Sequence, residues 1–172
     1  MKRVGWPIML LGAVLVHQGV WAEGHPVATI SVSGESVDLE APAGGRTVIM
    51  SLPLYRSAGV RYFSAGVGLE ERSAEYPPFP LKIVFTAGGK PFLSGVAVTI
   101  QPANAGAIAI PREQVEGPWL FVDLSPGLYD VTATFGDQTQ HLKGIRVESG
   151  KQKVVYLRWK DDRNTAATAI AE

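Results

Sequence analysis

Two histidines are the first candidates for reaction chemistry. The chain has 3 histidines and no cysteine, and only His25 and His141 lie beyond the leader-like N-terminal segment described below. A serine hydrolase needs a histidine beside a nucleophilic serine and an acid, but the sequence contains no Gly-x-Ser-x-Gly motif. His141 stands among polar residues in a predicted strand. We therefore expect an exposed or edge histidine there, and we assign no catalytic residues.

One short segment has the spacing of a metal site. If the leader is cut after Ala22, the chain begins Glu23-Gly24-His25. A free amine, two amide nitrogens and an imidazole at the third position form a square-planar nitrogen set that suits Cu(II) or Ni(II). Histidine also falls at this position by chance. The segment therefore stays an alternative, and we assign no metal ligand and no cofactor.

The glycines and acids of the segment 60–72 invite a catalytic interpretation that their spacing does not support. Gly66 and Gly68 lack the Lys-Ser/Thr pair and the long helix of a phosphate-binding loop, so they predict a structural turn. Glu70 and Glu71 fall in a predicted single helical turn before the prolines at 77–80. Neighbouring positions on a helix point in different directions, so we expect two solvated carboxylates.

The tryptophans have two possible roles. Trp119 and Trp159 are the two that follow the leader, and aromatic faces stack on the apolar faces of sugar rings. The competing interpretation is that both rings belong to the core or to an edge of a sheet, with Arg158 on a solvated strand face. Exposure of the two rings discriminates between ligand binding and packing.

Composition limits the classes of function. The chain has 172 residues, of which 46% are hydrophobic, with 16 basic and 16 acidic residues. This is enough apolar material for one packed domain. The neutral charge gives no general attraction to nucleic acid. The lack of cysteine excludes disulfides, thiolate metal sites and cysteine nucleophiles.

Residues 1–22 have the pattern of a secretory signal peptide. Met1-Lys2-Arg3 is basic, Ile8 to Val16 is apolar, and Ala22 is a small residue at the expected cleavage site. The apolar run is about ten residues, whereas a membrane span needs about 20. We therefore predict cleavage and no membrane span afterwards. A cysteine-free exported chain fits a bacterial periplasm.

The remainder divides into three predicted segments. Residues 23–58 form an extended, acidic N-terminal arm, with strands at 27–32 and 47–54 joined through a flexible connection at 41–45, and the arm protects a sheet edge. Residues 59–159 form a β-domain. Residues 160–172 lack periodicity and predict a disordered tail.

The β-domain is organised around the segment 117–136. Apolar residues run from Trp119 to Val122, Ser125-Pro126-Gly127 supplies turn chemistry, and the following residues alternate with a period of two. This pattern predicts a β-hairpin. Further strands are predicted at 81–85, 92–100, 107–110, 138–147 with a bulge at Gly144, and 155–159, and a polar loop at 111–117. About seven strands without crossover helices indicate an all-β, antiparallel sandwich or small barrel.

Residues 89–159 resemble a carboxypeptidase regulatory-like domain, which is a transthyretin-like (prealbumin-like) β-sandwich. The resemblance rests on three segments: Gly89-Lys90-Pro91 with Gly95 to Ile100, then Leu124 to Ala133 with its Pro-Gly-x-Tyr turn, then Val147-Glu148-Ser149-Gly150. The segments 60–72, 117–120 and 157–159 are similar to a bacterial exported single-domain subgroup. The peptidase His-x-x-Glu pair is absent, so the resemblance implies the fold and no activity.

Two relatives of this fold class imply enzymes. The hydroxyisourate hydrolases end in Tyr-Arg-Gly-Ser, from which Tyr156-Leu157-Arg158-Trp159 departs, and intradiol dioxygenases need two histidines and two tyrosines around iron. We therefore expect a non-enzymatic binding or assembly module of the cell envelope, acting on an unknown protein or carbohydrate partner through the arm or the loop 111–117. A hydrolase of the hydroxyisourate type and a Cu(II) or Ni(II) binder are the alternatives.

Overall fold

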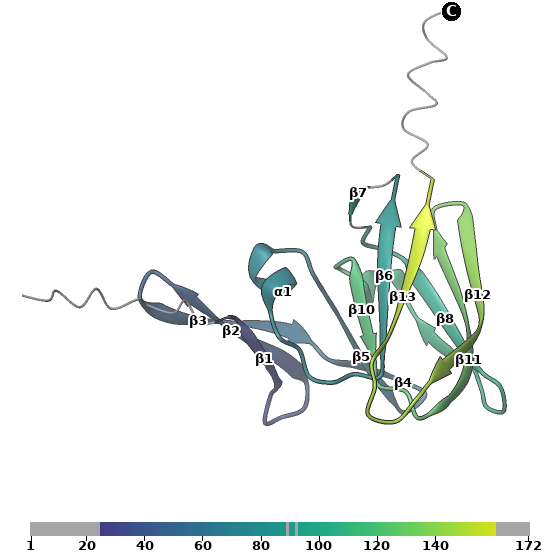
Figure 1. Ribbon diagram of the computed structural model, residues 1–172, viewed down its shortest axis with the longest axis horizontal. Helices are drawn as coiled ribbons and strands as arrows, with labels where there is room; N and C mark the ends of the chain where they lie inside the picture. The colour runs from purple at the N-terminus through teal and green to yellow at the C-terminus, as the bar shows by residue number, and fades with distance from the viewer. Residues whose placement is uncertain (1–24, 89, 92, 161–172) are drawn as a thin grey trace, which may run out of the picture.

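Three β-sheets dominate the computed structural model, which describes residues 25–88, 90–91 and 93–160 (Figure 1). The all-β expectation is therefore confirmed. The predicted signal peptide 1–22 and residues 161–172 of the predicted tail lie outside the described residues. Two sheets stack face to face, and the third extends to one side as an arm.

The first of the stacked sheets, here the large sheet, has the order β13-β6-β10-β5-β4, with β7 paired to β6. Its strands are β4 (Tyr55–Ser57), β5 (Val60–Ala65), β6 (Leu81–Ala87), β7 (Lys90–Pro91), β10 (Trp119–Val122) and β13 (Lys153–Trp159). The expectation of wholly antiparallel pairing is wrong at one place, because β13 runs parallel to β6. The chain crosses from the other sheet before β13 and so arrives in the same direction as β6.

The second, here the small sheet, has the order β12-β11-β8-β9. Its strands are β8 (Ala97–Pro102), β9 (Ile108–Ile110), β11 (Gly127–Phe135) and β12 (Gln138–Val147). The predicted strand 92–100 thus begins later, at Ala97. The predicted bulge is confirmed: the register shifts at Asp130, and Gly144, with φ of 65°, donates its N–H to the Asp130 carboxylate at 2.7 Å.

The hairpin predicted for 117–136 is wrong. β10 pairs with β5 and β6 in the large sheet, whereas β11 pairs with β8 and β12 in the small sheet. The turn residues therefore carry the chain from one sheet to the other. The Tyr129 hydroxyl fixes this corner by donating to the Ser125 carbonyl at 2.7 Å. Proline and glycine favour a sharp change of direction but do not specify which strands pair across it.

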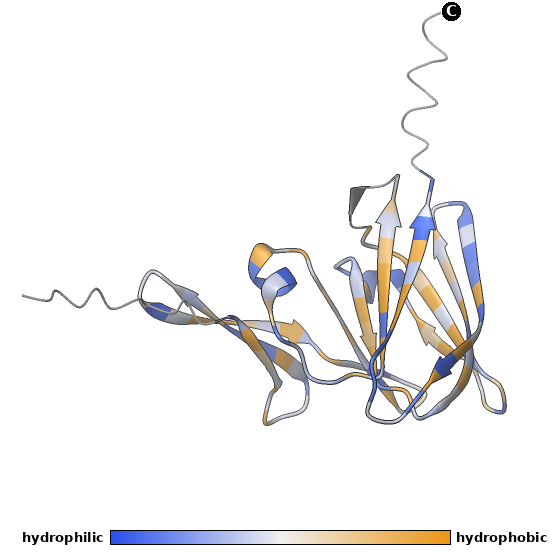
Figure 2. Ribbon diagram, viewed as in Figure 1, coloured by the Kyte–Doolittle hydropathy of each residue, from blue (hydrophilic) through white to orange (hydrophobic). Residues whose placement is uncertain are grey.

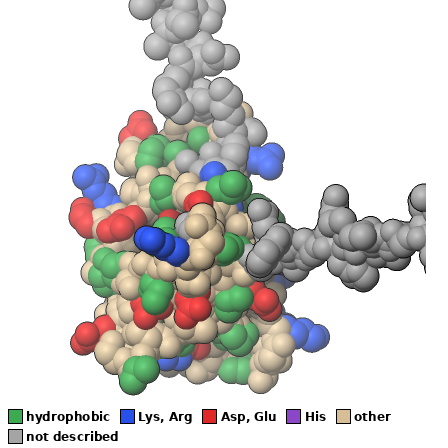
Figure 3. Space-filling view, turned by 90° about the vertical axis from the view of Figure 1, so that its left-hand side faces the viewer, with side chains coloured by type: hydrophobic (Ala, Val, Ile, Leu, Met, Phe, Trp, Pro, Cys, Tyr) green, Lys and Arg blue, Asp and Glu red, His purple; other side chains and the backbone are tan. Residues whose placement is uncertain are grey.

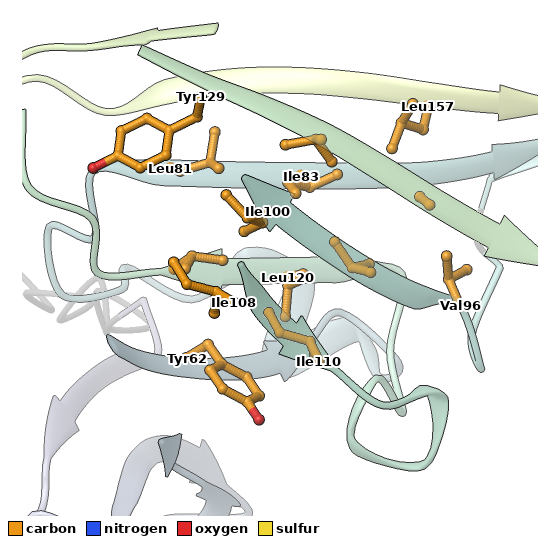
Figure 4. Packing of buried hydrophobic residues seen from close by; sticks show 14 of the residues in the cluster. Tyr62, Leu81, Ile83, Val96, Ile100, Ile108, Ile110, Leu120, Tyr129 and Leu157 are labelled. Carbon is orange, nitrogen blue, oxygen red and sulfur yellow. The ribbon is translucent and has the colours of Figure 1, made fainter. Parts of the chain in front are cut away.

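One apolar core fills the space between the large and small sheets. Side chains from β5, β6, β10 and β13 point toward those from β8, β9, β11 and β12 (Figure 4). Period-two alternation produces this arrangement, since each strand presents alternate residues to the opposite sheet. The largest fully buried members are Trp159, Tyr62, Phe85, Leu81, Ile83, Ile100, Ile110 and Leu120.

The arm sheet is a meander of β1 (Val27–Ile30), β2 (Ser36–Ala43) and β3 (Arg46–Pro53). Gly44 and Gly45, with φ of 56° and 78°, form the two-residue turn between β2 and β3. The flexible connection predicted at 41–45 is therefore wrong, because residues 41–43 belong to β2. Hydropathy varies along these strands (Figure 2).

The arm sheet covers part of one face of the large sheet, and the rest of the predicted arm contributes an edge strand to it. β4, which lies within the predicted arm, is the edge strand beside β5. Val37 and Leu39 of β2 are buried in a second apolar cluster with Phe63 and Phe121 of the large sheet. The short helix α1 (Leu69–Ser73) lies nearby, and η1 (Arg112–Gln114) interrupts the polar loop. Seen from the arm side, charged groups of both signs alternate with apolar ones (Figure 3).

Candidate functional site

The outer face of the large sheet is covered only in part. Phe63 and Phe121, on β5 and β10, stack with ring centroids 4.7 Å apart beneath the arm sheet. Toward β6 and β13 the same face is exposed to solvent: Tyr156 is 65% exposed and Val154 is 39% exposed. We call this uncovered region the open face; it is lined by Lys82, Val84, Trp119, Gln152, Val154 and Tyr156.

Strand register determines which open-face side chains are neighbours. Lys82 stands opposite Phe121 on β10 and Val154 on β13. Val84 stands opposite Trp119 on β10 and Tyr156 on β13. Residues directly opposite each other point to the same side of a sheet. Two adjacent rows of side chains thus cross the three strands and surround a hollow of about 340 Å³.

Lys82 is the charged group of the open face. Its Nζ atom lies 3.4 Å from the centroid of the Trp119 ring and 5.1 Å from that of Phe121, which is a cation–π arrangement. Half-burial against these rings lowers the pKa of Lys82 by desolvation. Within the described part of the chain the ammonium has neither an ion pair nor a hydrogen-bond acceptor.

Trp119 is held in place by the loop that follows β5. Gly66 has a φ of 98°, and a Cβ atom on it would lie 3.0 Å from Cδ2 of the indole. The Glu71 carboxylate accepts hydrogen bonds from the backbone N–H groups of Gly66, at 2.7 Å, and Val67, at 3.1 Å. The expectation that Glu71 is merely solvated is therefore wrong, because it fastens the loop that supports the indole.

A second hollow adjoins the open face. It measures about 250 Å³ and shares Gln152 with the first. The Gln152 side chain is oriented by donating from Nε2 to the Phe79 carbonyl at 2.9 Å. The other four residues that line the second hollow are all charged: Arg146, Glu148, Lys151 and Lys153. Together the two hollows offer an aromatic floor beside a basic rim.

The two histidines are not brought together. His141 is exposed on β12, the edge strand of the small sheet, with Nδ1 3.1 Å from the Thr132 hydroxyl. His25 is exposed ahead of β1, and Glu23 and Gly24 of the candidate metal motif lie outside the described residues. Across residues 25–88, 90–91 and 93–160, His, Asp and Glu form no group of three that could hold a metal ion.

The two tryptophans separate into different roles. Trp159 is 2% exposed, packs near Phe85, and donates its indole N–H to the Gln138 carbonyl at 3.3 Å. It is a core residue. Trp119 is half-buried and lines the open face. Arg158 is exposed on the outer side of β13, as expected.

The loop 111–117 is tied to the core through its side chains and backbone. Tyr62 donates its hydroxyl hydrogen to Gln114. Gly117 donates its N–H to the Ser64 hydroxyl at 2.8 Å. The loop is therefore partly a structural element that positions the start of β10.

Sequence analysis did not single out Lys82, Gln152 or Tyr156 as site residues. The sequences of β6 and β13 nevertheless contain a signal for this surface. Val84, Val154 and Tyr156 occupy the positions that alternate with the core residues, where a solvated strand would carry polar side chains. Apolar residues on both sides of a strand indicate that its outer side is also a contact surface.

No family model, curated protein or solved structure matches the chain. In the described part of the chain, every helix is too short or too polar to cross a membrane.

Proposed function

We propose that this protein is an exported, non-enzymatic binding module of the bacterial cell envelope, and that the open face is its ligand site. The observation that carries the proposal is the combination of Trp119, Lys82 and Tyr156 around one hollow on an otherwise covered sheet face. Exposed aromatic groups with a few polar groups around a concavity are typical of ligand sites. The N-terminal pattern of residues 1–22 supports export.

The fold we propose for the two stacked sheets is the transthyretin-like β-sandwich of carboxypeptidase regulatory-like domains. It is supported by the face-to-face sheets and by the Pro-Gly-x-Tyr corner, in which Tyr129 bonds back to Ser125. An experimental structure in which β10 and β11 pair in one sheet would contradict this assignment.

Tryptophan fluorescence tests the location of the site. After removal of the leader, Trp119 and Trp159 are the two fluorophores of this type. Titration of the mature protein with soluble peptidoglycan fragments and oligosaccharides should shift the emission, because Trp119 lines the hollow. The matched control is Trp119→Phe, which should lose the shift while the buried Trp159 still reports a folded core. A shift that persists in Trp119→Phe, or binding of none of these ligands, would contradict the proposal.

A further inference from the structure

The Lys82 ammonium offers hydrogen bonds that the described residues do not accept. A lysine ammonium has three donors. Its contacts here are the faces of Trp119 and Phe121, which attract the charge but accept no conventional hydrogen bond. Among the described residues, every buried side-chain nitrogen or oxygen has a hydrogen-bond partner. Because the Lys82 ammonium has none among these residues, it is not fully buried and a ligand can reach it. An anion entering the hollow would complete its coordination.

The surroundings of the open face also favour an anion. The adjoining hollow carries Arg146, Lys151 and Lys153, against one carboxylate, that of Glu148. Lys151 already pairs with Glu148 at 3.1 Å. The remaining positive charge therefore lies in a hollow that shares Gln152 with the open face.

The side chains around the hollow favour a saccharide. β6 is hydrogen-bonded to β10 and β13, and β10 is hydrogen-bonded to β5 and β6. β6 and β10 are therefore paired on both sides, whereas β13 is an edge strand of the large sheet. Around the hollow lie an exposed phenol ring at Tyr156, an indole at Trp119 and an amide at Gln152. Aromatic rings stack on sugar faces, and phenol and amide groups can hydrogen-bond to hydroxyls.

We propose that the open face binds a carboxylated saccharide, with the carboxylate paired to Lys82 and a sugar ring against Tyr156 and Trp119. This inference rests on the proposed function and names the ligand class of that same site. The hollow of about 340 Å³ is at the small end of the range for ligand pockets, which suits one or two sugar units.

Calorimetric titration with three trisaccharides and one peptide tests whether the open face binds a carboxylated saccharide. The probes are tri-galacturonate, its fully methyl-esterified form, maltotriose and tri-glutamate, each added to the mature protein at low ionic strength. Tri-galacturonate should bind at least about tenfold tighter than the ester or maltotriose, since a hydrogen-bonded ion pair is lost in both. Its affinity should fall with added NaCl.

Two variants complete the design. Lys82→Met keeps the apolar stem and should weaken tri-galacturonate binding at least about tenfold, while its thermal unfolding stays close to that of the parent. The matched control Lys143→Met, exposed on β12 and outside both hollows, should weaken binding less than about threefold. Equal weakening by both variants would contradict a specific role for Lys82.

The outcomes separate the two proposals. Equal binding of maltotriose and tri-galacturonate would overturn the acidic ligand but leave the open face as a saccharide site. Tighter binding of tri-glutamate would overturn the saccharide in favour of an acidic peptide. Failure of all four probes would overturn the carboxylated saccharide, and the proposed function would then be judged by the separate fluorescence test.

Discussion

The two halves of the outer face of the large sheet carry similar residues in different surroundings. Near β5 and β10, Phe63, Phe121 and Tyr76 are enclosed by the arm sheet. Near β6 and β13, Trp119 and Tyr156 remain accessible around a lone ammonium. Burial of aromatic surface stabilises the first half. The second half lacks that stabilisation, and its side chains stay accessible to solvent.

Truncation of an aromatic ring should separate the two halves most strongly. Phe121→Ala should lower the free energy of unfolding by about 3–5 kcal/mol, because it leaves a cavity beside Phe63 and Tyr76. Tyr156→Ala on the open face is the control and should change it by no more than about 0.5 kcal/mol. Urea unfolding measures both. Similar losses in the two variants would show that the halves do not differ in burial.

Gly117, just before β10, lies very close to β5, and its substitution should give the next largest loss of stability. A Cβ atom on Gly117 would lie 2.3 Å from the Ala65 carbonyl oxygen. Gly117→Ala should therefore force apart β5 and the segment before β10 and cost about 1–3 kcal/mol of unfolding free energy. Gly106→Ala is the control, because its Cβ would meet nothing within 4 Å. An unchanged free energy of unfolding in Gly117→Ala would show that β5 and the segment before β10 can move apart without cost.

Alkaline pH should destabilise the folded protein. Burial, with a smaller contribution from the Glu71 charge, raises the pKa of Tyr76 well above its ordinary value of 10.0. Burial also raises the pKa of Tyr62 and of Tyr129. The folded state therefore holds these protons more tightly than the unfolded state, and stability is intact below pH 10 and falls as the pH rises above it.

Absorbance of tyrosinate during a rise from pH 9 to 12 measures this effect. The folded protein should ionise fewer than its 5 tyrosines until unfolding releases the remainder. Tyr76→Phe should reduce the late, unfolding-linked part of the signal. Smooth ionisation of every tyrosine before any loss of structure would contradict burial of these hydroxyls.

The smallest expected effect concerns the loop behind Trp119. Glu71→Gln should weaken the bonds to the Gly66 and Val67 N–H groups and cost about 1 kcal/mol. Hydrogen exchange at these two amides should accelerate about fivefold. Glu70→Gln, next to it and exposed, should leave their exchange unchanged. Equal acceleration in both variants would indicate a general charge effect.

Sequence patterns predicted most strands but not how they are grouped. The alternation of residues 155–159 gives the correct buried side of β13, and Gly144 marks the bulge, because both signals are local. The path at Ser125-Pro126-Gly127 is not local. Whether a turn joins partners in one sheet or crosses between sheets depends on strands more than 20 residues away, such as β5 and β8.

The sequence of β6 and β13 indicated an outer contact surface but not which side chains meet on it, for a similar reason. Trp119 and Trp159 have similar local surroundings, yet one is accessible and the other is in the core. Their difference depends on what covers each side of the large sheet. Lys82 resembles any polar residue of an alternating strand until register places it over an indole contributed by β10.

The parallel pairing of β13 with β6 has a consequence for how the chain matures. Lys153 lies beside Leu81, so the large sheet is completed by a segment that leaves the ribosome some 70 residues after its neighbour. Leu157 and Trp159, which fill the core, arrive last. A nascent chain lacking them has no finished interior, and such distant contacts slow folding. Closure of the core thus depends on the last strand of the described part of the chain, so the two stacked sheets are completed late in synthesis.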